Sequence, residues 1–576
     1  MEKYYTIERS QQIVLQLLKS HGIKRIIASP GTTNLTLVAS AQQDSFFQLY
    51  SSVDERSAAY MACGMAAQTG EPVVLSCTGA TASRNYLPGL TEAYYRKLPV
   101  LAITANQGRD KVGHLIAQNI DRSTVPNDVA LLSVSVPSCW RDEDVANCEL
   151  KVNEALLELK HRGGGPVHID LSTTYSRDYS AKALPETRVI QRYTMGDALP
   201  TLPDGRIAIF VGSHATMNEP EVSAIEAFCE TYGAVVLCDK TSGYYGKYKV
   251  NPALLLGQRR YHTDLSFIET LIHIGEVSGD YYGLCIYPKQ VWRVNLDGVL
   301  RDTFRKLTAV FEMSEDTFFR YYADSERRSS NELLERFSSE YNKIYTALPE
   351  LPFSNIWIAK KLAPQLPENS VLHLGILNTL RSWNFFSTHD SIQTYCNVGG
   401  FGIDGILSTV IGSALVCPEK LFYCVIGDLA FFYDLNALGN RHVPKNLRIL
   451  LINNGRGTEF SNYMHPGHEF GEKAEPYIAA ARHFGNQSPL LVRHYAEDLG
   501  FSYLTASDKE TFEDACSHFL HPLDKESPIV FEVFTDSFAE SEAIRMVLNC
   551  LNNEAAPGKV SLLRSVARKV KRILHH

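Results

Sequence analysis

Short apolar runs that end in glycine or a polar residue alternate with helical patterns along almost the whole chain. This alternation is typical of repeated β-α-β units, which build mostly parallel sheets with helices on both faces. Strands that are buried on both faces read as nearly continuous apolar runs, and residues 421–427 and 447–452 are of this kind. The pattern therefore predicts an α/β protein made of stacked, doubly wound domains with mostly parallel sheets.

Three blocks of this pattern can be separated. We expect domains over residues 1–185, 200–345 and 350–550, with a polar linker at 175–204 and a charged helical bridge near 325–347. Helices are expected at 7–20 and 56–68. The predicted strands lie at 25–29, 72–77, 99–104, 167–171, 206–212, 234–239, 271–275, 291–296, 371–375, 421–427, 447–452 and 529–534.

Composition excludes several classes of protein. The 576 residues are 45% hydrophobic and 21% charged, which excludes a disordered or collagen-like chain. The net charge of −8 gives no positive field for nucleic acid. Twelve cysteines without a C-x-x-C pair indicate neither a zinc site nor a disulfide framework, and most are expected to be buried thiols. Without a signal peptide or an apolar stretch of about 20 residues, we expect a cytoplasmic protein.

The segment 555–576 differs from the rest of the chain. It holds six Lys and Arg residues and no acidic residue, and its apolar residues recur every three or four positions. A helix with one basic and one apolar face suits an anionic membrane surface, which predicts peripheral contact with the inner face of the membrane. The alternative is that this segment packs on an acidic patch of its own body or of a sister subunit, or frays.

Two predicted strands of the third block end in residues that suit a metal ion. Gly427 and Asp428 follow one strand, and Asn454 follows the next, 26 residues after Asp428. Ligands bind at the carboxyl ends of parallel strands, so these side chains are expected to converge. Carboxylate and amide oxygens suit Mg²⁺, which often bridges phosphate oxygens. The alternative is that both residues serve as turn or cap residues.

A carboxylate in the first block stands at a comparable position. Glu55 follows a short β-like run and precedes a helix rich in small residues. Taken alone, it reads as a helix N-terminal charge favoured by the helix dipole.

Taken together, these features resemble the thiamine-diphosphate (ThDP) dependent 2-oxo acid decarboxylases and carboligases. The closest resemblance is to their menaquinone-pathway branch, the 2-succinyl-5-enolpyruvyl-6-hydroxy-3-cyclohexene-1-carboxylate (SEPHCHC) synthases, or MenD. The resemblance spans nearly the whole chain in the family's order. The matching segments are residues 29–31, 53–56, 77–78, 92–94, 402–409, 427–429 with 434–436, and 453–454.

The resemblance implies a site. It assigns Glu55 to the pyrimidine nitrogen of ThDP, where a shared proton promotes catalysis. It assigns Asp428, Asn454 and the backbone carbonyl of Arg456 to Mg²⁺, and Ile403 to the support of the cofactor, although that residue alone reads as core. Further cofactor-binding residues are Thr78, Gly427 and Leu429. Because the family's two cofactor-binding domains come from different subunits, the resemblance implies a homodimer or homotetramer.

The departures from the branch concern substrate recognition. Residues 29–33, 279–280 and 397–399 lack cations that the branch carries there. Each lost cation removes a charge-assisted hydrogen bond to a substrate carboxylate, worth about 1.5–3 kcal/mol. We therefore expect a substrate different from that of MenD.

Several polar residues remain as candidates for substrate chemistry. Arg381 matches a substrate-facing arginine, and Gln118 matches a glutamine near the cofactor. Glu459 stands where the branch has an apolar residue; it suits acid or base chemistry on a neutral acceptor such as a carbonyl or sugar and repels an anionic one. The alternative for Glu459 is a position in solvent. Other candidates are His114, His442 and His465, although lone histidines are more often structural.

We therefore expect a ThDP- and Mg²⁺-dependent lyase or transferase. It would decarboxylate a 2-oxo acid donor and pass the acyl-anion equivalent to an electrophilic acceptor. A simple decarboxylase and an acetolactate-synthase-like enzyme are alternatives, but residues 206–296 lack a dinucleotide fingerprint for FAD. An inactive scaffold of the same fold would be expected to have lost Glu55, Asp428 or Asn454, and all three are present.

Overall fold

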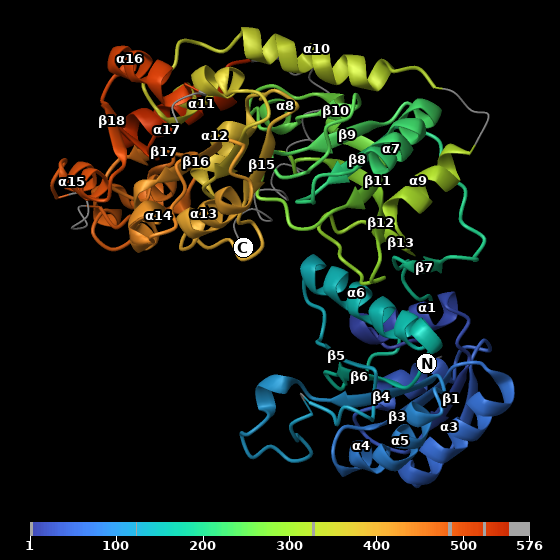
Figure 1. Cartoon of the computed structure of the whole chain (residues 1–576). Coiled ribbons are helices and arrows are strands. Elements are labelled where there is room, and N and C mark those ends of the chain that lie inside the picture. Colours follow the sequence, from blue (N-terminus) through green and yellow to red (C-terminus); the bar gives the residue numbers. More distant parts are fainter. Residues whose placement is uncertain (1–3, 123, 325–328, 482–486, 522–525, 552–576) are drawn as a thin grey trace. The chain divides into compact units, whose positions relative to one another are not determined.

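A computed structural model describes residues 4–122, 124–324, 329–481, 487–521 and 526–551 (Figure 1). The chain divides into two compact units, Met1–Asp197 with Gly298–Glu312 and Ala198–Asp297 with Met313–His576. The basic segment predicted at 555–576 lies outside the described residues.

The first unit is built on a parallel sheet with the strand order β2-β1-β3-β4-β6-β5. Its strands are β1 (Arg25–Ala28), β2 (Gln48–Ser51), β3 (Val73–Thr78), β4 (Val100–Asn106), β5 (Leu132–Val136) and β6 (Val167–Ser172). Its helices are α1 (Arg9–Ser20), α2 (Leu35–Ala41), α3 (Glu55–Thr69), α4 (Thr81–Asn85), α5 (Leu87–Tyr95) and α6 (Asp142–Glu158), with 3₁₀ turns η1 (Arg109–Lys111) and η2 (His161–Gly163). A second parallel pair joins β7 (Gln191–Thr194) to β13 (Leu307–Glu312).

Helices cover both faces of this sheet because alternate strand residues point to opposite sides. Helices α1 and α6 cover one face of the sheet, and α3 and α5 cover the other (Figure 1). Val74 of β3 packs in the core with residues of α1, α2 and α6, whereas Val73 and Leu75 pack in the core with residues of α3 and α5. Ala58 and Ala62 of α3 are fully buried, and small residues at these positions allow a helix to approach a sheet closely. The doubly wound arrangement expected for this block is confirmed.

The second unit contains two parallel sheets. The first has the order β10-β9-β8-β11-β12. Its strands are β8 (Ile207–Val211), β9 (Val235–Cys238), β10 (Lys249–Val250), β11 (Phe267–Ile274) and β12 (Tyr287–Asn295). The helices of this region are α7 (Glu219–Tyr232), α8 (Ala253–Leu256), α9 (Glu315–Ala323) and α10 (Glu332–Thr346), with the 3₁₀ turn η3 (Asp264–Ser266).

The other sheet of the second unit has the order β15-β14-β16-β17-β19-β18. Its strands are β14 (Val371–Leu374), β15 (Gln393–Cys396), β16 (Phe422–Gly427), β17 (Leu447–Asn453), β18 (Ser502–Ala506) and β19 (Ile529–Phe534). The helices are α11 (Asn355–Leu362), α12 (Asn378–Asn384), α13 (Ile406–Val416), α14 (Asp428–Tyr433), α15 (Leu491–Asp498), α16 (Lys509–Leu520) and α17 (Ser537–Leu548), with 3₁₀ turns η4 (Ala363–Gln365), η5 (Leu435–Gly439), η6 (Thr458–Ser461) and η7 (Pro466–Ala474).

The α/β class with parallel sheets is confirmed, and each predicted strand overlaps an observed one. The linker predicted at 175–204 is interrupted by β7, which the sequence did not indicate. All twelve cysteines are free thiols. Among the described helices, none has the length and apolar character that crossing a membrane requires. The domain boundaries drawn from the sequence stay a prediction.

Candidate functional site

The predicted metal ligands lie at the carboxyl ends of two neighbouring strands. Asp428 is the first residue of α14, directly after β16, and Asn454 directly follows β17. The two strands pair in parallel, with Gly427 opposite Ile452, so their ends meet at one edge of the sheet. Asp428 is only 2% exposed, which places a carboxylate inside the protein at this edge.

Asn454 has an unsatisfied buried atom. Its Nδ2 donates to Thr458 Oγ1 at 3.5 Å, whereas its buried Oδ1 has no hydrogen-bond partner among the described residues. A buried acceptor left in this state costs about 1–3 kcal/mol, so this oxygen requires a partner such as an ordered water or a metal ion. A carboxylate and an amide oxygen are ligands that Mg²⁺ accepts. The residues present therefore fit a magnesium site.

Arg456 could contribute only its backbone carbonyl to a metal ion, because a guanidinium is a cation without an acceptor atom. Its side chain is ion-paired with Glu475. In the described part of the chain, no group of three or more His, Cys, Asp or Glu side chains is arranged to hold a metal ion. A ligand set of one carboxylate, one amide and one carbonyl is consistent with that result.

A second buried carboxylate close to Asp428 was missed by the sequence reasoning. Glu532 of β19 is buried and accepts hydrogen bonds from Asn453 Nδ2 at 2.6 Å and from Tyr503 Oη at 2.7 Å. Burial raises the pKa of Glu532, and the charge of Asp428 raises it further, while the two hydrogen bonds oppose the shift. Its sequence signal was one acidic residue inside an otherwise apolar strand.

The remaining cofactor candidates of this unit surround α13 and α14. Gly427 is the N-cap of α14, Leu429 is half-buried in its first turn, and Ile403 packs partly buried against the core beneath α13. Asp434, at the end of α14, accepts hydrogen bonds from the backbone N–H of Ser408 at 2.6 Å and from its Oγ at 2.7 Å. This pair fixes the first turn of α13 to the end of α14.

Arg381 and Glu459 form a buried ion pair. Arg381 Nη1 donates to Glu459 Oε1 at 2.6 Å, and the side chains are only 7% and 19% exposed. Burial lowers the pKa of Arg381, but the negative charge of Glu459 and its hydrogen bond have the larger combined effect. The pKa of Arg381 is therefore above its usual value. The guanidinium also lies 4.3 Å from the ring centre of Tyr281, which stacks on Phe401 at 6.2 Å.

Glu459 has further partners that connect it to Asn454, one of the predicted metal ligands. With the Asn378 amide nitrogen facing Glu459, it donates to Glu459 Oε2 at 2.6 Å, and its oxygen accepts from Thr458 Oγ1 at 3.1 Å. Thr458 also accepts from Asn454. The solvent position considered for Glu459 is therefore wrong, because both of its oxygens have protein partners. The second unit brings Arg381, Glu459 and Asn454 into one polar network.

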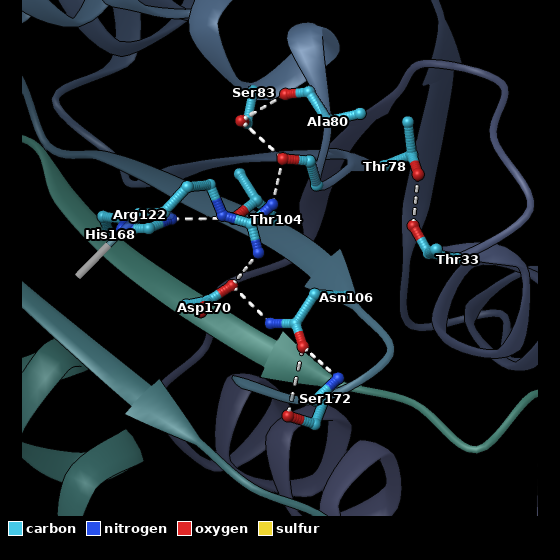
Figure 2. Close-up of polar contacts among 12 residues, drawn as sticks. Thr33, Thr78, Ala80, Ser83, Thr104, Asn106, Arg122, His168, Asp170 and Ser172 are labelled. Carbon is cyan, nitrogen blue, oxygen red and sulfur yellow. Dashed lines mark hydrogen bonds and ion pairs between the residues drawn. The ribbon is translucent and has the colours of Figure 1, made fainter. Parts of the chain in front are cut away.

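The first unit holds Glu55, which begins α3. Asp54 caps this helix by accepting from the N–H of Arg56 at 3.0 Å, and Glu55 Oε2 accepts from Asn85 Nδ2 at 3.4 Å. Thr78, at the end of β3, is hydrogen-bonded to Thr33 (Figure 2). Burial raises the pKa of the neighbouring Cys77 to about 12, and the charge of Glu55 contributes to that rise. Glu55 therefore lies near the end of β3.

Gln118 belongs to an exposed segment between β4 and β5. Gln118 and Leu115 adopt positive φ angles of 65° and 58°. The segment ends at Arg122, which is buried and bonds to the Gly79 carbonyl and to Asp170 (Figure 2). Arg122 was not predicted as a site residue, because contacts between distant residues leave no local pattern in a sequence.

Two of the three histidine candidates are exposed, and the third caps a 3₁₀ turn. His114 lies exposed in the same segment as Gln118, and His442 lies exposed after η5. His465 Nδ1 accepts from the N–H of Gly467 at 3.0 Å, and its ring packs edge-on against Phe460 at 5.2 Å. His465 therefore serves as the cap of η7, which is the structural alternative for this residue.

Comparisons with known proteins identify the family. Residues 9–125 match the thiamine pyrophosphate enzyme, N-terminal TPP binding domain. A SEPHCHC synthase of Bacteroides fragilis is 31% identical over 570 residues, covering 95% of this chain and 100% of that protein. The one of Phocaeicola vulgatus is 30% identical over 96% and 100% of the two chains, and that of Desulfotalea psychrophila is 29% identical over 90% and 96%. The chain therefore belongs to the SEPHCHC synthase family of ThDP-dependent enzymes that break and form C–C bonds.

Proposed function

We propose that this enzyme uses ThDP and Mg²⁺ to decarboxylate a 2-oxo acid and transfer the remaining acyl fragment to an uncharged electrophilic acceptor. When bound, ThDP supplies the electron sink for decarboxylation. The observation that carries the proposal is the buried, unpartnered Oδ1 of Asn454 at the strand edge that also presents Asp428. The family membership supports the ThDP chemistry.

The chain's own residues would act at the two ends of the cofactor. Asp428 Oδ, Asn454 Oδ1 and the carbonyl of Arg456 would hold Mg²⁺ against the diphosphate. Glu55 would share a proton with the pyrimidine nitrogen, which is the task of a positioned general acid or base. Its one described side-chain partner, Asn85 at 3.4 Å, is a weak one, so the carboxylate keeps acceptor capacity for this role.

We further propose that the active unit is a homodimer or a larger assembly of dimers. Exposed apolar residues flank both sets of candidate residues. Val53, two residues before Glu55, is 79% exposed, and Tyr433, at the end of the helix that Asp428 begins, is 68% exposed. Tyr60 of α3 is exposed as well. Apolar surface beside a polar site supports its burial by another subunit.

The substrate is proposed to differ from the one that the relatives' names describe. Those names specify a product that carries succinyl and carboxylate groups. Here the charge of Arg381 is already compensated by Glu459, and both oxygens of Glu459 have partners. A substrate carboxylate would have to displace Glu459 or lie beside its negative charge. An uncharged carbonyl compound avoids both costs.

We propose a cytoplasmic enzyme whose basic segment 555–576 contacts the membrane surface. The charge pattern of that segment supports this proposal. Flotation with anionic vesicles of the full chain and of a chain ending at Pro557 tests this. Equal flotation of the two proteins contradicts membrane contact through the segment.

The variant Glu55→Gln tests the catalytic proposal. The protein would be incubated with ThDP, Mg²⁺ and a panel of 2-oxo acids with and without aldehyde acceptors, while CO₂ and product masses are recorded. We expect loss of turnover with folding and ThDP binding retained. Glu71→Gln is the matched control, because Glu71 pairs with Arg25 on the surface. Unchanged turnover in Glu55→Gln contradicts the assignment, and CO₂ release without a ligated product indicates a simple decarboxylase.

A further inference from the structure

The segment that carries Gln118, residues 107–121, has little internal support. The N–H groups of Lys111, His114 and Asn119 donate to carbonyls within the segment. Leu115 is fully exposed, and both Leu115 and Gln118 adopt left-handed backbone conformations that cost non-glycine residues free energy. Such a conformation persists only when the surrounding structure fixes it, so the attachment of the segment at its two ends becomes important.

Both ends of this segment attach to the same carboxylate. At its start, Asn106 Nδ2 donates to Asp170 Oδ1 at 2.6 Å, while Asn106 Oδ1 accepts from the N–H of Gly108. At its end, Arg122 is ion-paired with the same oxygen of Asp170 (Figure 2). Asp170 therefore closes the base of a loop, in the manner of compact surface loops whose ends lie together.

Arg122 also connects this base to the region of Glu55. Its second Nη group donates to the carbonyl of Gly79, one residue after Thr78 at the end of β3 (Figure 2). The charges of Glu55 and Arg122 act on the same Cys77 thiol with opposite sign, so both side chains lie near it. One buried guanidinium thus joins the strand end beside Glu55 to the base of the Gln118 segment.

We propose that Arg122 is a positioning residue, which sets where Gln118 stands relative to Glu55 by joining the Gly79 carbonyl to Asp170. The inference rests on the proposed function, because Gln118 acts near the cofactor only if that function holds. Lysine is a poor replacement, since a single ammonium lacks the rigid fork that spans both acceptors. A displacement of about 1 Å in such a group can lower a rate about 100-fold.

The test separates positioning from folding. Arg122→Met leaves Asp170 buried without its cation and is expected to destabilise the unit. The double variant Arg122→Met with Asp170→Asn removes both charges, while the amide oxygen at position 170 can still accept from Asn106 Nδ2. Removing both members of a buried ion pair costs far less stability than removing one. Arg122→Lys keeps the positive charge, and it replaces the double variant in the same measurements if the double variant does not fold. Arg109→Met, on the exposed part of the segment, is the matched control.

Two readouts are compared for the ThDP- and Mg²⁺-loaded protein. The first is hydrogen exchange of residues 107–121 by mass spectrometry, and the second is kcat and KM for CO₂ release from pyruvate or 2-oxoglutarate. We expect about 10-fold faster exchange in the double variant and kcat/KM lower by about 10- to 100-fold, with unchanged melting temperature and ThDP affinity. Arg109→Met should match the wild type.

Exchange or kcat/KM at the wild-type level in a folded Arg122 variant overturns the proposal. Wild-type protein without any 2-oxo acid turnover contradicts the proposed function instead. In that case exchange in the segment still decides whether Arg122 holds it in place.

Discussion

Replacing Glu459 by glutamine tests the charge compensation at Arg381. The wild-type pair is 2.6 Å long and largely buried, whereas glutamine offers only a neutral acceptor. A hydrogen bond between charged groups contributes about 1.5–3 kcal/mol, so we expect Glu459→Gln to lower the free energy of unfolding by about 2 kcal/mol. For a unit of about 360 residues, that corresponds to a melting temperature lower by about 2–3 °C.

The same change should alter ligand preference. With Arg381 no longer neutralised, a dicarboxylate gains one charge-assisted hydrogen bond, which corresponds to about 10- to 100-fold tighter binding. Calorimetric titration of 2-oxoglutarate into both proteins, with ThDP and Mg²⁺ present, measures this. Arg381→Met in the Glu459→Gln background should abolish the gain.

Glu513→Gln is the matched control for stability. Glu513 pairs with Lys361 at the same distance of 2.6 Å, but its side chain is 51% exposed, so a loss below about 1 kcal/mol is expected. A Glu459→Gln variant that melts like the wild type and binds 2-oxoglutarate no tighter refutes the reasoning.

Three further changes are predicted. Asn454→Leu should weaken Mg²⁺-dependent ThDP binding at least about 10-fold, because a hard oxygen ligand is lost; an unchanged Mg²⁺ titration contradicts the metal site. Gly79→Ala should reproduce the Arg122→Met phenotype, since a Cβ would lie 2.6 Å from the Ala105 carbonyl oxygen and collide with the Arg122 guanidinium; wild-type melting and kinetics would count against it. Burial lowers the pKa of His168 to about 4, while Asp170 and Arg122 act on it with opposite sign. Between pH 6.5 and about 4, the unfolded chain therefore binds one proton more than the folded chain. As the pH is lowered through this range, the free energy of unfolding decreases by about 1.4 kcal/mol per pH unit. Urea titrations at several pH values should show that His168→Gln lacks the part of this pH dependence that one proton causes. The same pH dependence in His168→Gln and in the wild type would show that His168 does not cause it.

The central strands could be predicted because burial on both faces leaves a continuous apolar run. Residues of β16 and β17 are almost all buried, and the polar residues directly after them predict a metal site at this edge of the sheet. The residues of the edge strand β2 are mostly exposed and do not alternate between apolar and polar, so its sequence gives little indication of a strand. β7 is short and half-exposed, and was therefore interpreted as linker.

Pairings between distant residues could not be predicted. Arg381 and Glu459 were separate candidates, yet they form one ion pair across 78 positions because η6 turns Glu459 back toward α12. Arg122 and Asp170 are 48 positions apart and were not singled out at all. Charge pairing depends on how elements pack, whereas the sequence pattern reports only which face of an element is apolar.

Mixed dimers test the central claim that Glu55 of one chain and the Asp428–Asn454 edge of another serve the same ThDP. Glu55→Gln and Asn454→Leu proteins would be unfolded together in equal amounts and refolded. Decarboxylation of a 2-oxo acid would then be assayed at ThDP and Mg²⁺ concentrations at which each variant alone is inactive. If each site combines two chains, half of the dimers carry one intact site, and we expect about a quarter of wild-type activity. A mixture as inactive as its parents would contradict a site shared between chains.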